Sequence, residues 1–357
     1  MQKSLTALAA LATAAMLPYA AQTASAETAM PRYEVLPMHG TGVQYSPKSS
    51  KLVTWQGTFT YDNAKKTYTM VGTTPKKSKT TTFTIYAIPV KMVYGSQNGN
   101  MTFDPTVDQA NGVSIVQNLL NSPLFNSLDW KWGSLDMGTT QYEDAFQRGS
   151  FWGNVGKKKG AKYHVVFAAP TVLSEVTMTV SAADGKVENN PFGAGVIGTQ
   201  DINVFDTAVQ GWIRSFTQVN PSTLPLFITD NIYLTEGGCC IGGYHSAEGN
   251  GQTYSYATYV TSAGAFSEDI SAFSHELGEW YDDPLTNNNG YCGGLLEVGD
   301  PIEGLANYGT FTVTFGGVTW HPQALTFLSY FGAPLKDSAN SWYDNQHYLT
   351  SVCQHGQ

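Results

Sequence analysis

The chain has 357 residues, of which 42% are hydrophobic and 13% are charged, and its formal net charge is −9 at pH 7. This length suffices for one or two domains with a sizeable hydrophobic core. The acidic balance excludes nucleic acid and anionic membranes as partners that the net field of the protein would attract.

The first 26 residues have the pattern of a secretory signal peptide. Lys3 gives a positive start, an apolar run follows, and Ala24-Ser25-Ala26 is a small-residue cleavage site. The apolar run is too short to span a bilayer comfortably, and no later segment has the length and apolarity of a membrane helix. We therefore expect a secreted protein, extracellular or periplasmic, after signal-peptide cleavage near Ala26.

Residues 27–200 have the pattern of a β-rich region with helices, and the sequence leaves open whether they form a separate domain. Runs of Thr, Val, Ile, Tyr and Phe predict strands at residues 52–61, 66–72, 80–94, 163–169 and 175–180. Apolar spacing predicts helices at residues 107–120 and 139–152. In the second helix, Thr140 and Glu143 have the spacing of a capping box.

Residues 201–357 combine further strands with two helices. Strands are predicted at residues 225–234 and 253–260, a Gly- and Cys-rich loop at 237–251, and helices at 201–216 and 267–282. Asp201 is expected to cap the first helix, and Val204, Ala208 and Trp212 to form its buried stripe. The element pattern as a whole predicts an α+β fold, a mixed sheet with packed helices.

The four cysteines are Cys239, Cys240, Cys292 and Cys353. Four cysteines in a chain expected to be exported favour two disulfides. Adjacent cysteines rarely bond to each other because disulfide geometry strains the peptide between them. We therefore expect Cys239 and Cys240 to bond separately to Cys292 and Cys353, which would clamp the 237–251 loop to the segments after the second helix.

The candidate catalytic and metal-binding residues lie on the helix predicted at 267–282, in residues 274–284 (SHELGEWYDDP). His275 and Glu279 are four residues apart, so they lie one turn apart on one helix face, with Glu276 at its edge. The pattern is that of the H-E-x-x-H metalloprotease helix with glutamate in place of the second histidine. Asp283-Pro284 ends the helix, since proline disfavours helical geometry in the residue before it. The spacing predicts a metal site.

A second acidic segment follows, with Glu297 and Asp300. The two segments together resemble zinc peptidases of the thermolysin kind, in which a glutamate at broadly this separation is the third ligand. The resemblance implies a zincin-like strand–helix core in the C-terminal half and a peptide or protein substrate. It implies His275, Glu279 and Glu297 as metal ligands, Glu276 as general base, and Asp300 as the residue that orients His275.

The sequence leaves the third ligand and the metal open. Asp283 lies another turn along the ligand face and is an alternative ligand, although Asp282 is better aligned by helix geometry. Two carboxylates and one imidazole cancel the charge of the ion, so Mn²⁺ or Ca²⁺ competes with Zn²⁺. His245 and His321, each in a predicted loop, are candidates for stabilising an oxyanion.

A wider resemblance covers the C-terminal third. Residues 240–246 (CIGGYHS), a strand, a helix and residues 283–291 (DPLTNNNGY) resemble the plant phosphate-induced, EXORDIUM-like family. Bacterial proteins of similar layout carry H-E-x-x-E followed by Asp-Pro. The resemblance implies export and one continuous fold.

These features predict a secreted metal-dependent hydrolase, most simply a peptidase. One alternative is a non-catalytic secreted protein that binds cell-wall polysaccharide or a surface partner, for which the many tyrosines and tryptophans suit sugar stacking. Another is a structural calcium site.

Overall fold

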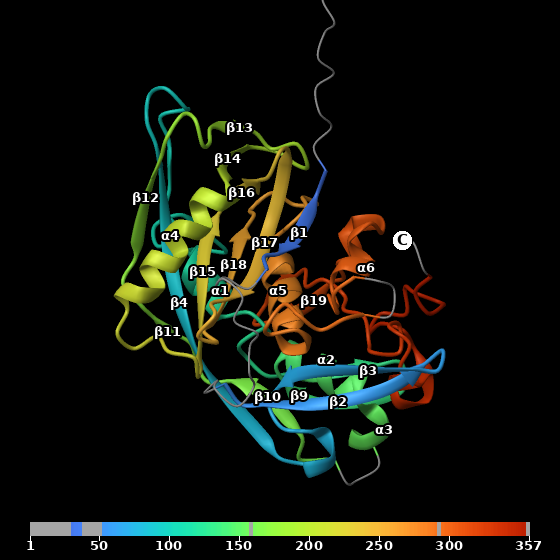
Figure 1. The fold of residues 1–357 in the computed structure, drawn as a ribbon. Helices are drawn as coiled ribbons and strands as arrows, with labels where there is room; N and C mark the ends of the chain where they lie inside the picture. The colour runs from blue at the N-terminus through green and yellow to red at the C-terminus, as the bar shows by residue number, and fades with distance from the viewer. Residues whose placement is uncertain (1–29, 38–51, 157–159, 291–293, 355–357) are drawn as a thin grey trace, which may run out of the picture.

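The computed structural model describes residues 30–37, 52–156, 160–290 and 294–354 (Figure 1). The predicted signal peptide and Cys292 lie outside these ranges. Within the described part, no helix is long and apolar enough to cross a membrane.

The centre of the molecule is a mixed twelve-stranded sheet, with the main order β10-β4-β15-β18-β17-β16-β14-β13. The 15-residue strand β4 (Thr80–Tyr94) is its longest member and pairs in parallel with β10, β11, β12 and β15. Strand β1 adds to β17 in parallel. The remaining strands of this sheet are β1 (Arg32–Val35), β5 (Thr102–Phe103), β10 (His164–Phe167), β11 (Thr171–Val172), β12 (Val176–Val180), β13 (Val187–Asn189), β14 (Val196–Asp201), β15 (Thr223–Asp230), β16 (Ile232–Thr235), β17 (Cys239–Ala247) and β18 (Thr253–Tyr259).

Four two-stranded hairpins and six α-helices surround this sheet in the described ranges. The hairpins are β2 (Thr54–Tyr61) with β3 (Ala64–Val71), β6 (Gln109–Ala110) with β7 (Val113–Ser114), β8 (Leu128–Trp132) with β9 (Leu135–Thr140), and β19 (Val313–Phe315) with β20 (Val318–Trp320). The helices are α1 (Ile115–Leu120), α2 (Tyr142–Ser150), α3 (Trp152–Val155), α4 (Ile202–Ser215), α5 (Ser271–Asp282) and α6 (Asp300–Glu303).

Helix α4 covers one face of the sheet. Asp201 caps it as expected, with its carboxylate accepting from the backbone N–H of Asn203 and Val204 at 2.9 and 3.0 Å. The buried stripe consists of Ile202, Phe205, Val209 and Ile213, and these pack on a core that includes Phe227 and Tyr256. The stripe predicted through Val204 was wrong, because Val204 is exposed.

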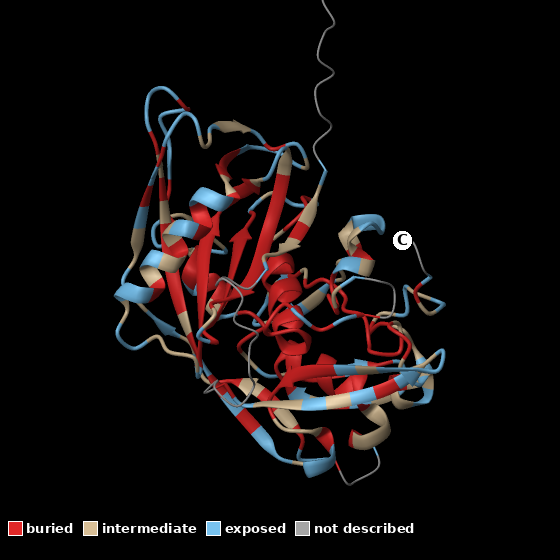
Figure 2. Ribbon diagram, viewed as in Figure 1, coloured by how far each residue is buried: buried red, intermediate tan, exposed pale blue. Residues whose placement is uncertain are grey.

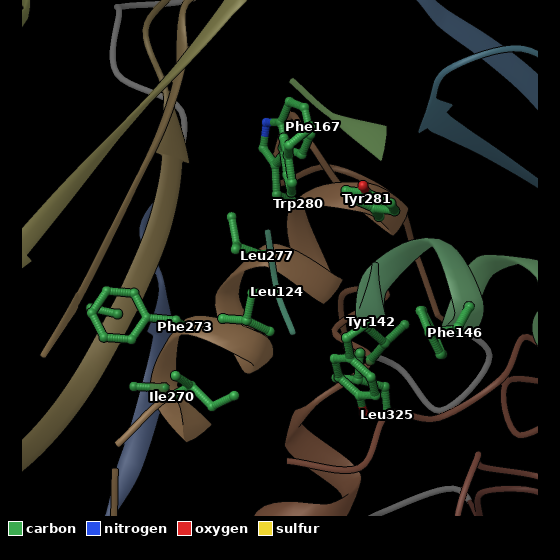
Figure 3. Close-up of a cluster of buried hydrophobic side chains, with 14 of the residues drawn as sticks. Leu124, Tyr142, Phe146, Phe167, Ile270, Phe273, Leu277, Trp280, Tyr281 and Leu325 are labelled. Carbon is green, nitrogen blue, oxygen red and sulfur yellow. The ribbon is translucent and has the colours of Figure 1, made fainter. Parts of the chain in front are cut away.

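Helix α5 lies on the other face, and all of its residues are buried (Figure 2). It contacts β17 and β18 of the sheet, β1, β3 and helix α2. Its apolar side chains lie beside those of Tyr142 and Phe146 of α2, Phe167 of β10, and Leu124 and Leu325 from loops (Figure 3). Polar anchors fix the helix as well: Trp280 Nε1 donates to Thr253 Oγ1 of β18 at 2.9 Å, and Tyr281 Oη donates to the Val165 carbonyl of β10 at 2.9 Å. Each fully buried large apolar side chain contributes about 1.5–3 kcal/mol, which helps to offset the cost of burying the acids on the same helix.

The predicted fold class, an α+β zincin-like core of packed helices, was wrong. The described chain is mostly β, with a large curled sheet and few helices. Local patterns marked the strands but carried no sign that so many of them join one layer, since strand pairing between distant segments leaves no local signal. Strands from both sides of residue 200 share this sheet.

Three element predictions also differ from the structure. The helix expected at 107–120 begins only at Ile115, because residues 109–114 form the β6–β7 hairpin. The strand expected at 225–234 is divided into β15 and β16 at Asn231, whose φ is 52°. The loop expected at 237–251 is largely strand β17.

Candidate metal centre

Helix α5 places His275, Glu276 and Glu279 inside the protein. The helix ends at Asp282, before Asp283-Pro284, as the sequence predicts. Its packing between the sheet, β1 and α2 leaves His275 and Glu276 with no exposed surface and Glu279 with 1%. The chemistry that the motif suggests is therefore in a buried setting, where charges need partners.

His275 is held by a residue that the sequence did not indicate. Its Nδ1–H donates to Oε1 of Gln323 at 2.6 Å. The amide of Gln323 is itself oriented, because Nε2 donates to the carbonyls of Tyr308 and Gly299 at 3.2 and 3.5 Å. Gln323 thus fixes the ring and directs Nε2 toward Glu279.

The ring nitrogen of His275 that faces Glu279 is the one without a hydrogen bond. Nε2 lies 2.9 Å from Oε1 of Glu279, yet Nε2 has no hydrogen-bond partner of correct geometry in the described structure. Burial opposes protonation of His275, but the charges of Glu279 and Asp300 outweigh burial and raise its pKa to about 9. Burial raises the pKa of Glu279, but the positive charge of His275 lowers it by more, so the pKa of Glu279 lies below its usual value. A proton and a metal ion therefore compete for Nε2.

His245 lies on the opposite side of Glu279. It comes from strand β17, not from a loop, and is fully buried. Its Nδ1 lies 3.3 Å from Oε2 of Glu276 and 3.5 Å from Oε2 of Glu279. Its Nε2 lies 3.2 Å from the Asp283 carbonyl and 3.7 Å from Oε2 of Glu297. His245 reaches α5 because strand β17, on which it lies, packs directly against this helix. The disulfide clamp expected from the sequence is not what places it there.

The cysteine pairing expected from the sequence differs from the structure. The sulfur atoms of Cys239 and Cys240 contact each other at the start of β17. This contact differs from the expected separate pairing with Cys292 and Cys353, and Cys292 lies outside the described residues.

Glu297 and Asp283 complete the buried part of the centre. Neither oxygen of Glu297 accepts from an N–H group among the described residues, and the side chain faces the carboxyl groups of Glu279 and Asp283 instead. Asp283 Oδ1 accepts the backbone N–H of Asn287 and Asn288 at 2.9 and 3.0 Å, whereas Oδ2 has no such partner there. Burial raises the pKa of Asp283 to about 7, and burial together with the Glu279 charge raises the pKa of Glu297 well above its usual range. Both acids have oxygens free for a cation.

Asp300 lies at the solvent-exposed side of the centre. Its side chain is 50% exposed, and Oδ1 lies 3.6 Å from Nε2 of His275. The orienting contact implied for Asp300 is made by Gln323 instead, because Asp300 faces the ligand nitrogen and not Nδ1. Asp300 is thus in a position to complete a ligand set from outside.

Two of the predicted residues lie elsewhere. His321 Nδ1 lies 2.7 Å from Asp269 and 3.5 Å from Glu268, ahead of α5, and it contacts none of the α5 carboxylates. Asp282, which helix geometry favoured, faces α2 and contacts Gln147. Of the two neighbouring acids, Asp283 is therefore the one beside His245 and Glu297.

The fully ionised centre has an excess of negative charge that a cation would balance. Four carboxylates are buried together with two histidines, and in the described ranges no lysine or arginine forms an ion pair with any of them. The four are Glu276, Glu279, Asp283 and Glu297. Burial, with the Glu279 charge, raises the pKa of Glu276 well above its usual range. Mixed imidazole and carboxylate donors with free lone pairs suit Zn²⁺ or Mn²⁺. The residues therefore fit a metal ion.

Strand β1 covers this centre. The ring of Tyr33 lies 3.9 Å from the ring of His275, centroid to centroid, at an interplanar angle of 33°. None of five surface cavities of about 320 to 410 Å³ in the described structure is lined by His245, His275 or Glu279. Both histidines and Glu276 have no exposed surface, and in this sense the centre is closed. Like Gln323, Tyr33 has no motif or spacing that would have identified it.

No protein-family model, curated protein or solved structure matches the chain.

Proposed function

We propose that this protein is a secreted metal-dependent hydrolase that acts on peptides. The observation that carries the proposal is the buried His275–Glu279 pair, whose Nε2 and Oε1 lie 2.9 Å apart outside hydrogen-bond geometry. Nε2 of His275 and Oε1 of Glu279 are close enough to coordinate the same metal ion. A metal ion held there would polarise a carbonyl and lower the pKa of a bound water.

Glu276 is the general base of the proposal. It neighbours both ligands on α5, and its Oε1 has no hydrogen-bond partner in the described part of the chain. Its Oε2 lies 3.3 Å from Nδ1 of His245, so the carboxylate stands between the two histidines of the centre. A carboxylate so placed accepts the proton of the attacking water.

The outer edge of β17 supports a peptide substrate. Strand β1 pairs with β17 in parallel, with Val35 opposite His245. This edge therefore already accepts an extended polypeptide next to the centre, and a substrate strand that replaces β1 gains the same backbone hydrogen bonds.

The test measures metal content and hydrolysis of a peptide library by the mature protein. The wild type should contain stoichiometric metal and cleave peptides. The variant Glu276→Gln should keep its metal and lose about 10²–10⁴-fold in rate, whereas Glu236→Gln, at a partly exposed surface acid, should change neither. Wild-type protein without metal would overturn the proposal, and full activity of Glu276→Gln would reject the base.

The closed centre favours one rival, a structural metal site in a non-catalytic protein. Tyr33 over His275 is the observation behind it. In that case the protein binds metal and a chelator lowers its melting temperature, but no peptide is cleaved.

A further inference from the structure

The carboxylate of Glu279 lies between two histidines that come from different elements. Its Oε1 is 2.9 Å from Nε2 of His275 on α5, and its Oε2 is 3.5 Å from Nδ1 of His245 on β17. One carboxylate therefore presents a separate oxygen to each ring. This is the arrangement of a carboxylate that bridges two metal ions about 3.5–4 Å apart.

Two sets of possible ligands meet at Glu279. Ligand atoms of His275, Glu276 and Glu279 lie within 4.8 Å of one another, and so do those of His245, Glu279 and Glu297. All five residues are buried, and only Glu279 belongs to both sets. The second set supplies one imidazole and two carboxylates, which is enough for one ion. In the first set His275 and Glu279 are the ligands and Glu276 remains the general base, so Asp300, whose Oδ1 lies 3.6 Å from Nε2 of His275, completes that set.

Both histidines are oriented in the same way. Nδ1 of His275 is held by the Gln323 carbonyl oxygen at 2.6 Å, and Nε2 of His245 lies 3.2 Å from the backbone carbonyl of Asp283. In each ring the nitrogen that faces a carbonyl oxygen carries the hydrogen, so the other nitrogen presents its lone pair to Glu279. An ion at only one histidine would leave the lone pair of the other histidine facing Glu279 without a ligand role.

The second set also contains unpartnered buried atoms of its own. Both oxygens of Glu297, which is 4% exposed, and Oδ2 of the fully buried Asp283 accept from no N–H group among the described residues. Glu297 faces the carboxyl groups of Glu279 and Asp283, which cannot satisfy it while all three are ionised. These atoms lie on the His245 side, where an ion beside His275 does not satisfy them. Unsatisfied buried carboxylate oxygens are costly.

The charge of the fully ionised centre matches two divalent ions better than one. Glu276, Glu279, Asp283 and Glu297 carry four negative charges when all are ionised. One divalent ion leaves two of these charges buried without compensation, whereas two divalent ions balance them.

We propose that the centre binds two divalent metal ions bridged by Glu279, one beside His275 and one beside His245. The proposal rests on the proposed metal-dependent function and specifies its centre. The second ion takes His245 and Glu297 as its own ligands, and Glu276 stands next to both.

The experiment loads the mature protein with Mn²⁺ alone and measures bound metal by elemental analysis and spin coupling by electron paramagnetic resonance. The wild type should bind two ions per chain and give an exchange-coupled signal. His245→Ala should bind one ion with an uncoupled signal, and Glu279→Gln should lose the coupling.

The control is His321→Ala, because His321 stands in a separate acidic group with Glu268 and Asp269. It should keep two coupled ions. Loss of the second ion in His321→Ala places that ion in the other group and overturns the inference. His245→Gln, checked by circular dichroism, replaces His245→Ala if the smaller side chain prevents folding.

The outcomes separate the two proposals. One ion in the wild type, unchanged by His245→Ala, overturns the two-ion centre but leaves the metal-dependent function in place. No bound ion in the wild type overturns both.

Discussion

The side chains of His275 and Gln323 meet at 2.6 Å, although they are 48 positions apart in the chain. Gln323 is fully buried, and its amide is fixed by two backbone carbonyls. The histidine is therefore positioned by a segment that follows the helix in sequence, and the orientation of the metal ligand depends on how the C-terminal segment packs.

Replacing Gln323 with leucine should weaken metal binding about 10–100-fold, because the ring loses the acceptor that orients it. Gln323→Glu, which keeps an acceptor at Nδ1, should restore most of the affinity. Gln218→Leu, at an exposed glutamine, is the matched control. Competition with a fluorescent chelator measures the Kd, and equal affinity of Gln323→Leu and wild type would contradict the orienting role.

A methyl group at Gly299 should disturb the same ring. A Cβ at this position would collide with the ring of His275 at Nδ1, so the ring must shift from the position in which it meets Gln323. Gly299→Ala should therefore lose about tenfold or more in metal affinity. Gly304→Ala is the matched control, since its Cβ meets open space and both glycines have negative φ. Two equal affinities would show that the ring has room to move.

Removal of the Tyr33 ring should open the centre. Tyr33 is 5% exposed and lies over His275. Tyr33→Ala should lose its metal to a chelator about tenfold faster, the equivalent of about 1.4 kcal/mol, which is in the range of an aromatic contact. Tyr33→Phe keeps the ring and should exchange at the wild-type rate. If stopped-flow chelation gives one rate for all three proteins, β1 does not control access.

Asp230 should make stability depend on pH. It is buried at the end of β15 near Asp108 and Asp104, and burial followed by the Asp108 charge raises its pKa to about 8. A raised folded-state pKa means that the acid is protonated in the fold. Its contribution is fully present below the unfolded pKa of about 4 and is lost as pH rises through about 8.

Asp230→Asn should therefore gain stability relative to wild type as pH increases from about 4 to about 9, by a few kcal/mol at the upper end. Asp129→Asn, at an exposed aspartate of the β8–β9 hairpin, should show no such trend. Urea unfolding at several pH values measures the difference, and a constant difference between Asp230→Asn and wild type would refute the expectation.

The sequence predicted the elements whose signals are local. Strand 80–94 has the predicted bounds because β-branched and aromatic residues dominate it from Thr80 to Tyr94. Helix α4 begins at its Asp201 cap, and α5 ends before Pro284. The same kind of reasoning brought His275, Glu276 and Glu279 together, because helical spacing alone determines which residues share a face.

The sequence failed where packing between distant segments decides. Residues 237–251 are rich in glycine and were expected to be a loop, but β17 needs glycine because α5 packs so close to it. A Cβ at Gly243 would lie 2.8 Å from Cγ of Glu276. Thr140 was expected to cap α2, yet its hydroxyl donates to Asp144 within a buried network. Gln323 and Tyr33 come from remote segments, and local patterns carry no record of such contacts.

The uncompensated carboxylates have a consequence for the whole molecule. The centre joins α5, β17 and the segment around Glu297, so an ion bound there holds together parts of the chain that are far apart in sequence. An ion present at a hundred times its Kd stabilises the folded state by about 2.7 kcal/mol through mass action. Under the proposed metal-dependent function, the melting temperature therefore follows the trace metals of the growth medium and the chelators of the buffers, and preparations that differ only in these should differ in stability.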